Sequence, residues 1–325
     1  MNSKTSVPEY FDVIIVGAGA AGLTAAIYTS RRALKTLIIS KDVGGQAALT
    51  TEIENYPGVG LVDGFDLMNR FLADAKKFGA ILKSEEAKKI EKDGGDFIIT
   101  TNSNQYRAAA IILAFGLTPR DLGVPGEEEL KGRGVSYCAT CDGPLFKEKN
   151  VAVIGGGNSA LDAAEYLSRI AKKVYLIHRR DKFRGDEILV DRVKKISNIE
   201  ILYNTNIARI KGNNKVEAIE LVDTNNQPLK DLSVDGLFVE IGHIAKTEWV
   251  GDLVEFDDHK QIKTNKNCET KTPGIFAAGD VTDIEYKQII ISGGEGAKAA
   301  LQAYKYLQQT KGIKGTSIDW GTAKK

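Results

Sequence analysis

Two stretches of the chain share one order of apolar, small and polar residues. In each, a short apolar run leads into a glycine cluster, then a stretch of small residues with helical spacing, then a second apolar run. A buried strand, a tight turn, a helix and a parallel strand produce this order. The predicted elements are strand 11–16, helix 23–31, strand 36–40, strand 150–154, helix 161–170 and strand 173–178.

Each of these patterns continues into short strands separated by turn residues and closes with an apolar strand that ends in glycine, at 110–116 and at 237–242. The chain therefore reads as two copies of one βαβ-plus-meander unit. The first copy also contains residues 64–79, whose apolar positions have the spacing of an amphipathic helix.

The remaining tail predicts a strand at 274–278 and a helix at 295–308, without a third glycine cluster. We expect this tail to complete the first domain. The predicted fold class is α/β, with two Rossmann-like nucleotide-binding domains, the second inserted into the first. The expected domains are residues 1–119 with 248–325, and residues 120–247.

Composition excludes several classes of protein. The 325 residues include 44 Lys and Arg and 43 Asp and Glu, giving a net charge of +1, so the basic excess typical of nucleic-acid binding is missing. The apolar stretch 13–27 contains too many glycines and small residues to predict a membrane helix. The chain has only three cysteines, and this small, odd number argues against the disulfide framework of a secreted protein. We expect a cytoplasmic protein that binds neither nucleic acid nor membrane.

The glycine clusters carry the first chemical prediction. Gly17, Gly19 and Gly22 form G-x-G-x-x-G, and Gly155, Gly157 and Ala160 occupy the same places in the second copy. In this motif the first glycine makes the turn, the second lets the backbone approach a pyrophosphate, and the third position packs helix on strand. The alternative is a glycine turn without a ligand. Because the strand and helix context occurs twice, the sequence predicts two dinucleotides.

The residues after the second strand of each copy indicate which nucleotide binds. In the second copy they are His178-Arg179-Arg180, with Arg184 beyond, and guanidinium groups suit a 2′-phosphate. This favours NADPH over NADH, and the alternative is a solvated basic turn. The first copy has Ser40-Lys41-Asp42, with no acid at the usual ribose position.

Cys138-Ala139-Thr140-Cys141 precedes the second glycine cluster. Two thiols at this spacing can close a small disulfide and relay electrons. A structural disulfide and a zinc site are the alternatives, although zinc needs four ligands and the other candidates, Cys268, His178, His243 and His259, are scattered. Asp142 is either a general acid beside the pair or an ordinary turn residue.

Together these motifs resemble the low-molecular-weight thioredoxin reductases over nearly the whole chain. The segments that carry the resemblance include Cys138–Gly143, the G-G-G-N-S-A cluster, Gly44-Gly45-Gln46, Glu54–Gly58, Ile241-Gly242-His243 and Thr272–Asp280. Two departures are Lys287-Gln288-Ile289, where the family often has Arg-Gln-Ala, and Ala245, where a proline is common.

The resemblance implies an FAD domain interrupted by an NADPH domain. It implies that the first glycine cluster holds the FAD pyrophosphate, that Gln46 and Asn55 approach the flavin, and that Asp280 binds the ribityl–phosphate part. The residues expected around FAD are Gly17, Gly19, Ala20, Gly22, Gly45, Gln46, Asn55, Gly279, Asp280, Lys287, Gln288 and Ile289. Those expected around NADPH are Gly155, Gly157, Asn158, Ser159, His178, Arg179, Arg180 and Arg184.

The resemblance also implies that Cys141 faces the flavin, that Cys138 attacks the protein substrate, and that Asp142 is the acid. Electrons would pass from NADPH through FAD and this pair to thioredoxin or a thioredoxin-like protein, in a homodimer. Two other functions remain open. One is a flavin-dependent NADPH reductase for ferredoxin or another acceptor that does not use the cysteines, and the other is a flavin-dependent sensor without turnover.

Overall fold

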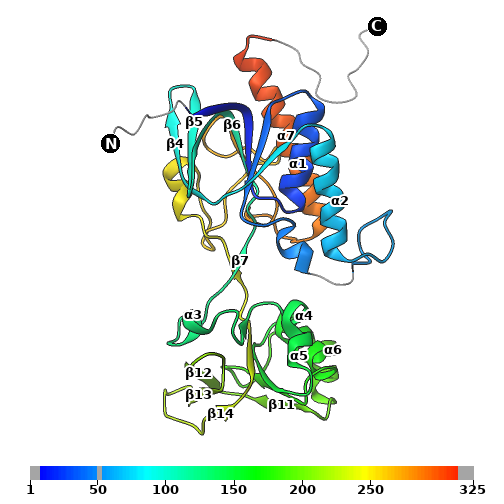
Figure 1. Cartoon of the computed structure of the whole chain (residues 1–325), viewed down its shortest axis with the longest axis vertical. Helices are drawn as coiled ribbons and strands as arrows, with labels where there is room; N and C mark the ends of the chain where they lie inside the picture. Colours follow the sequence, from blue (N-terminus) through cyan, green and yellow to red (C-terminus); the bar gives the residue numbers. More distant parts are fainter. Residues whose placement is uncertain (1–7, 50–52, 314–325) are drawn as a thin grey trace. The chain divides into compact units, whose positions relative to one another are not determined.

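The computed structural model describes residues 8–49 and 53–313 and divides the chain into two compact units (Figure 1). Unit 1 comprises residues 1–117 and 245–325, and unit 2 comprises residues 118–244. The chain therefore crosses between the units at 117/118 and 244/245, where the sequence predicted 119/120 and 247/248.

Unit 1 contains a mixed seven-stranded sheet in the order β3-β2-β1-β6-β5-β4, with β17 also pairing with β6. Its strands are β1 (Glu9–Val16), β2 (Thr36–Ser40), β3 (Ile81–Ser84), β4 (Ala87–Asp93), β5 (Asp96–Thr101), β6 (Gln105–Leu113) and β17 (Ile275–Ala277). The first half of β6 pairs antiparallel with β5, and its second half pairs parallel with β17. One strand thus joins the meander to the parallel core.

Helices α1 (Ala20–Arg31), α2 (Gly64–Lys77) and α7 (Ile289–Thr310) lie together on one side of this sheet (Figure 1). α1 and α7 approach closely, because a Cβ added at Gly296 would lie 2.0 Å from the carbonyl oxygen of Ala21. Buried Ala299, Ala303 and Leu307 of α7 share one apolar core with α1. The opposite face of the sheet is covered by the short helix η3 (Glu248–Leu253) and its neighbours.

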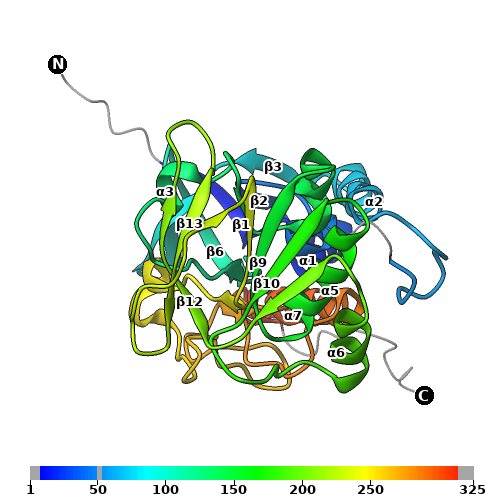
Figure 2. The ribbon, with the colours of Figure 1, turned by 90° about the horizontal axis from the view of Figure 1, so that it is seen from below.

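Unit 2 contains a parallel five-stranded sheet in the order β11-β10-β9-β15-β8. Its strands are β8 (Val135–Ser136), β9 (Asn150–Gly155), β10 (Lys173–Ile177), β11 (Ile199–Leu202) and β15 (Gly236–Glu240). Helices α5 (Asn158–Ser168) and α6 (Glu187–Lys194) cover one face, and the meander covers the other (Figure 2). The carboxyl ends of β9 and β15 meet where the strand order reverses, which is where nucleotides bind in such sheets.

The short elements of unit 2 are α3 (Glu127–Leu130), α4 (Ala139–Asp142), η2 (Gly143–Phe146), β7 (Thr118–Pro119) and β16 (His243–Ile244). β7 and β16 pair antiparallel, so the two chain crossings run side by side at the edge of the unit. The hydrogen bond from Arg120 N to Gly242 O adds to this pairing.

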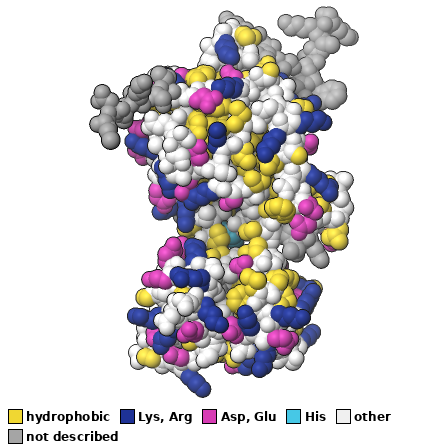
Figure 3. Space-filling view, in the orientation of Figure 1, with side chains coloured by type: hydrophobic (Ala, Val, Ile, Leu, Met, Phe, Trp, Pro, Cys, Tyr) yellow, Lys and Arg dark blue, Asp and Glu magenta, His cyan; other side chains and the backbone are white. Residues whose placement is uncertain are grey.

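The structure confirms the predicted α/β class and shows how the two copies differ. In unit 1 the meander extends the parallel sheet through β6, whereas in unit 2 it forms a separate sheet of β12 (Thr205–Lys211), β13 (Ala218–Asp223) and β14 (Leu232–Ser233). None of the helices in the described residues is long and apolar enough to cross a membrane. Positive and negative side chains are interspersed over the face in Figure 3.

Candidate functional site

In the glycine turn of unit 1, protein atoms fill the space beside the first and third glycines, and the space beside the second is free. A Cβ at Gly17 (φ +110°) would lie 2.2 Å from Ala114 O, and one at Gly22 would lie 1.9 Å from Gly17 O. At Gly19 the nearest atom would be 3.8 Å away. Gly19 is also the N-cap of α1, where no described side chain bonds the first N–H groups. Room and unpaired donors therefore coincide where a pyrophosphate fits.

Unit 2 repeats this arrangement. A Cβ at Gly155 would lie 2.2 Å from Glu240 O and 2.6 Å from the Cβ of buried Ala160, whereas one at Gly157 would meet no atom within 4 Å. Gly157 is the N-cap of α5, again without a side-chain cap among the described residues. Both turns therefore fit a dinucleotide.

The ring of His178 packs against the glycine turn of unit 2. It is 5% exposed, and a Cβ at Gly156 would collide with its ring. Its Nε2 lies 3.0 Å from Lys182 O, and the ring packs against Phe183. Burial lowers the pKa of His178 below its ordinary value. The structure therefore gives this residue a supporting position under the glycine turn.

Arg179, Arg180 and Arg184 are all exposed just beyond the end of β10. Within residues 8–49 and 53–313, none of the three guanidinium groups pairs with a carboxylate. Arg184 N donates to Gly156 O at 2.7 Å, which fixes the third arginine beside the glycine turn. Three unpaired cations at this position suit a 2′-phosphate.

Asn158 and Ser159 are exposed in the first turn of α5. Asn158 bonds Asp186 twice, as donor to Oδ2 at 3.0 Å and as acceptor from its backbone N at 2.8 Å. The amide therefore ties the loop that carries Arg184 to the start of α5.

The predicted FAD residues of the first half gather around the first turn. Ala18 N donates to Ser40 Oγ at 3.2 Å, so the serine at the usual ribose position stabilises the turn itself. Gly44 N donates to Ala18 O, and a Cβ at Gly45 would lie 3.9 Å from Gly19 Cα. Gln46 is exposed in the short helix η1 (Gly45–Leu49), and buried Ala20 opens α1.

Two other predicted residues, 233 positions apart, meet directly. Asn55 Nδ2 donates to Gln288 Oε1 at 3.1 Å. Gln288 is the N-cap of α7, and Ile289, its first residue, packs on the same small core as Ala20. The structure therefore brings these residues into one region of unit 1.

Lys287 holds the turn that contains Asp280. Its Nζ donates to Asp280 O at 3.1 Å, Thr282 O at 2.7 Å and Gln261 Oε1 at 3.3 Å. Burial lowers the pKa of Lys287, and nearby carboxylates oppose that effect. On the other side, Ser292 Oγ donates to Asp280 Oδ1 at 3.0 Å. This role could not be predicted from the sequence, because two of the three acceptors are backbone carbonyl groups.

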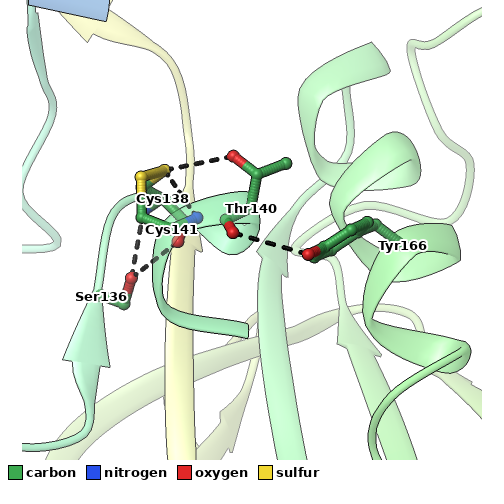
Figure 4. The surroundings of a disulfide bond; sticks show 5 residues. All are labelled: Ser136, Cys138, Thr140, Cys141 and Tyr166. Atoms are coloured by element: carbon green, nitrogen blue, oxygen red, sulfur yellow. Dashed lines mark hydrogen bonds between the residues drawn. A yellow bond between two sulfur atoms is a disulfide. The ribbon is translucent and has the colours of Figure 1, made fainter. Parts of the chain in front are cut away.

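Cys138 and Cys141 form a disulfide at the first turn of α4 (Figure 4). Cys138 is half-buried and Cys141 is exposed. The segment is held by Ser136, whose Oγ accepts from Cys138 N at 3.1 Å and donates to Cys138 O at 3.2 Å. Cys141 N points at Cys138 Sγ across 3.2 Å, an arrangement that would stabilise a thiolate there. Half-buried Asp142 ends α4.

A network that the sequence analysis missed fixes the residue before the disulfide. Tyr137 OH donates toward Glu127 Oε1 at 2.7 Å and Asp121 Oδ1 at 2.9 Å. Glu127 is 4% exposed and also accepts from the backbone N–H groups of Leu122 and Gly123. Burial and the two carboxylates raise the pKa of Tyr137. The network joins the first chain crossing to the redox segment, and its members are separated by too many residues for a motif.

Cys268 lies apart, 1% exposed in the core of unit 1. Burial and the nearby Glu295 raise the pKa of its thiol to about 12, which disfavours the thiolate form at neutral pH. No cluster of three metal-ligating side chains occurs in the part of the chain that the structure describes.

The chain is similar to known proteins over most of its length. Residues 11–304 match the pyridine nucleotide-disulphide oxidoreductase family. The thioredoxin reductase of Listeria monocytogenes is 44% identical over 94% of this chain and 97% of its own length. Among solved structures, the thioredoxin reductase of Lactococcus lactis has a TM-score of 0.82 at 37% identity, over 92% of this chain and 99% of its own. The thioredoxin reductase of T. acidophilum has a TM-score of 0.79 at 38% identity, over 91% of this chain and 98% of its own.

Proposed function

The chain belongs to the pyridine nucleotide-disulphide oxidoreductase family and to its thioredoxin reductases, and on that premise we propose that it uses NADPH to reduce the disulfide of thioredoxin or a thioredoxin-like protein. The observation that carries this proposal is the Cys138–Cys141 disulfide, in the same unit as the arginine-flanked glycine turn. A flavin reductase without a disulfide step would have no use for this pair.

The two nucleotide sites are assigned by their surroundings. We assign FAD to unit 1, where Asn55, Gln288 and Asp280 gather beyond the glycine turn. We assign NADPH to unit 2, because Arg179, Arg180 and Arg184 offer unpaired charge for a 2′-phosphate. When bound, FAD would supply a two-electron carrier between the nicotinamide and the disulfide.

The cysteines divide the exchange reaction between them. Once the pair is reduced, the Cys138 thiolate, stabilised by Cys141 N–H, attacks one sulfur of the partner disulfide and forms a mixed disulfide. Cys141 then attacks Cys138 Sγ, which closes the Cys138–Cys141 bond again and releases the partner as a dithiol. We propose that Asp142, at the end of α4, gives a proton to a departing thiolate.

The test is an anaerobic titration of the purified protein with NADPH, followed through the visible flavin absorbance. Because the disulfide and the flavin each accept two electrons, bleaching of the wild type should be complete only after more than one equivalent. Cys138→Ser is the matched control: it removes the disulfide, so one equivalent should suffice. The same variant should no longer reduce thioredoxin.

Other outcomes would favour the alternatives. Complete bleaching of the wild type at one equivalent, with acceptor reduction unchanged in Cys138→Ser, would indicate a flavin reductase that does not use the pair. Binding of both nucleotides without turnover on any disulfide protein would indicate a sensor.

We further propose that the protein works in the cytoplasm as a homodimer. Unit 1 exposes large apolar side chains, among them Leu61 (65% exposed) and Phe65 (59% exposed), at the start of α2. Exposed apolar side chains of this size are typical of protein interfaces. Light scattering should give twice the mass of the chain, and Phe65→Asp should lower it.

A further inference from the structure

Glu240 is a half-buried acidic residue that the proposed function does not use. It is the last residue of β15, after the buried Leu237, Phe238 and Val239. Burial raises the pKa of Glu240 to about 7. Within the described residues no cation and no hydrogen-bond donor pairs with its carboxyl group. A half-buried carboxyl group without a protein partner, at the end of a β-strand, is a candidate for contact with a ligand.

The register of the sheet places Glu240 beside both functional segments. Glu240 pairs with Gly155, the first glycine of the turn, on β9. On the other side β15 pairs with β8, where Phe238 is opposite Ser136. Glu240 stands two residues beyond that pair on β15, and Cys138 stands two residues beyond it on β8. Along the carboxyl edge, the order is therefore arginines after β10, glycine turn after β9, Glu240 on β15 and the disulfide after β8.

The alternation of side chains along β15 gives the direction of Glu240. Phe238 belongs to the apolar core that contains Ala139 of α4 and Ala160 of α5. Val239 belongs to the core on the opposite face. Because side chains two residues apart share a face, Glu240 points to the same side as Phe238, toward α4 and the start of α5.

The positions assigned to the 2′-phosphate and the pyrophosphate set the direction in which a dinucleotide would lie along this edge. With its 2′-phosphate at Arg179 and Arg180 and its pyrophosphate at Gly157, its nicotinamide half extends over β15, toward the disulfide. We propose that Glu240 accepts a hydrogen bond from the nicotinamide half of NADPH, from either a ribose hydroxyl or the carboxamide N–H. This inference rests on the proposed function, since it requires NADPH in unit 2.

The chemistry of the carboxyl group limits what it can contact. An ionised carboxylate repels the pyrophosphate, so the anionic part of the ligand is not its partner. Ribose hydroxyls and the carboxamide N–H are donors, and a carboxylate is the residue type that binds ribose hydroxyls in such folds. Such a donor would also satisfy the acceptor that the protein leaves unpaired.

The test compares two ligands on the oxidised, FAD-loaded protein by calorimetry: NADP⁺, which has both halves, and 2′,5′-ADP, which has only the adenosine half. In Glu240→Leu, the affinity for NADP⁺ should fall roughly 10-fold, the loss of one hydrogen bond to a charged group. The affinity for 2′,5′-ADP should be unchanged. Glu240→Gln retains an acceptor oxygen and nearly the same shape, so its loss should be smaller.

Arg180→Ala is the matched control on the other side of the glycine turn, and it should weaken both ligands. The 3-acetylpyridine analogue of NADP⁺ lacks the carboxamide donor. If the wild type binds it as weakly as Glu240→Leu binds NADP⁺, the contact is to the carboxamide; if the wild type binds it as well as NADP⁺, the contact is to the ribose.

Equal weakening of both ligands by Glu240→Leu, or no weakening of either by both Glu240 variants, would overturn the inference. A wild-type protein that binds neither NADP⁺ nor 2′,5′-ADP would overturn the NADPH assignment itself, and the inference with it.

Discussion

At the residue scale, the glycines of each turn have separable duties. The first glycine of each turn, and the third glycine in unit 1, allow close contacts within the protein, and the second leaves space open. This division follows from the motif, so the sequence predicted it. The contacts of Lys287 and Tyr137 could not be predicted, since their partners are distant in sequence or belong to the backbone.

Two alanine substitutions in unit 1 should separate folding from cofactor binding. In Gly22→Ala the new Cβ would lie 1.9 Å from a backbone oxygen, so the variant should lose roughly 1–3 kcal/mol of stability. In Gly19→Ala the new Cβ meets no atom closer than 3.8 Å, and the change in stability should stay below about 1 kcal/mol. Gly19→Ala should nevertheless retain less flavin. Chemical unfolding and the ratio of flavin to protein absorbance measure the two effects, and equal flavin retention in Gly19→Ala and wild type would contradict the site.

Glu85 makes a pH-dependent contribution to stability. Burial would raise the pKa of this carboxyl group, but hydrogen bonds from Thr101, Tyr106 and Asn104 outweigh burial and lower it. A carboxyl whose pKa is lower in the folded state stabilises the protein above its unfolded pKa, and that stability is lost as the pH falls through the folded pKa.

The comparison of wild type with Glu85→Gln tests this effect. At neutral pH the variant should be about 1–3 kcal/mol less stable, because its amide cannot accept all three bonds. Below about pH 4.5 the carboxyl of the unfolded wild type takes up a proton first, so the difference should shrink as the pH falls, until the folded carboxyl is protonated as well. Urea unfolding at several pH values measures the difference, and one that does not change with pH would refute the explanation.

At the element scale, tertiary packing determined the features that the sequence prediction missed. The helix expected at 295–308 begins earlier, at Ile289. Its first turns were not predicted because Gly293, Gly294 and Gly296 each lower helix propensity by about 1 kcal/mol. The absence of a side chain at Gly296 is what lets α7 approach α1. The separate sheet formed by the second meander was also unpredictable, since both meanders have the same local pattern.

The turn from Gly279 to Thr282 depends on Lys287, which has replaced the arginine frequent at this position. Lys287→Met removes two hydrogen bonds to the turn and a third to Gln261, and should weaken FAD binding roughly 10-fold, because Asp280 loses its fixed position. Lys287→Arg should restore most of the affinity if the positive charge is what holds the carbonyl groups. Flavin titration of the apoprotein measures both, and unaltered affinity in Lys287→Met would show that Ser292 alone suffices.

At the scale of the whole molecule, unit 2 is a continuous segment with two apolar cores of its own. Residues 118–244 expressed alone should therefore fold cooperatively and bind NADP⁺ about as tightly as the full chain. Circular dichroism during urea unfolding and calorimetry check the two expectations. A fragment that unfolds without a cooperative transition would mean that unit 2 depends on unit 1.

Unit 1, in contrast, is assembled from both ends of the chain, and this fixes an order of events during synthesis. β17 and α7 are translated after the whole of unit 2, yet Ala299, Ala303 and Leu307 complete the core around α1. Unit 2 can fold during translation, whereas the apolar face of α1 stays uncovered until α7 leaves the ribosomal exit tunnel. A message truncated before residue 289 would therefore yield a chain that still binds NADPH but never acquires flavin.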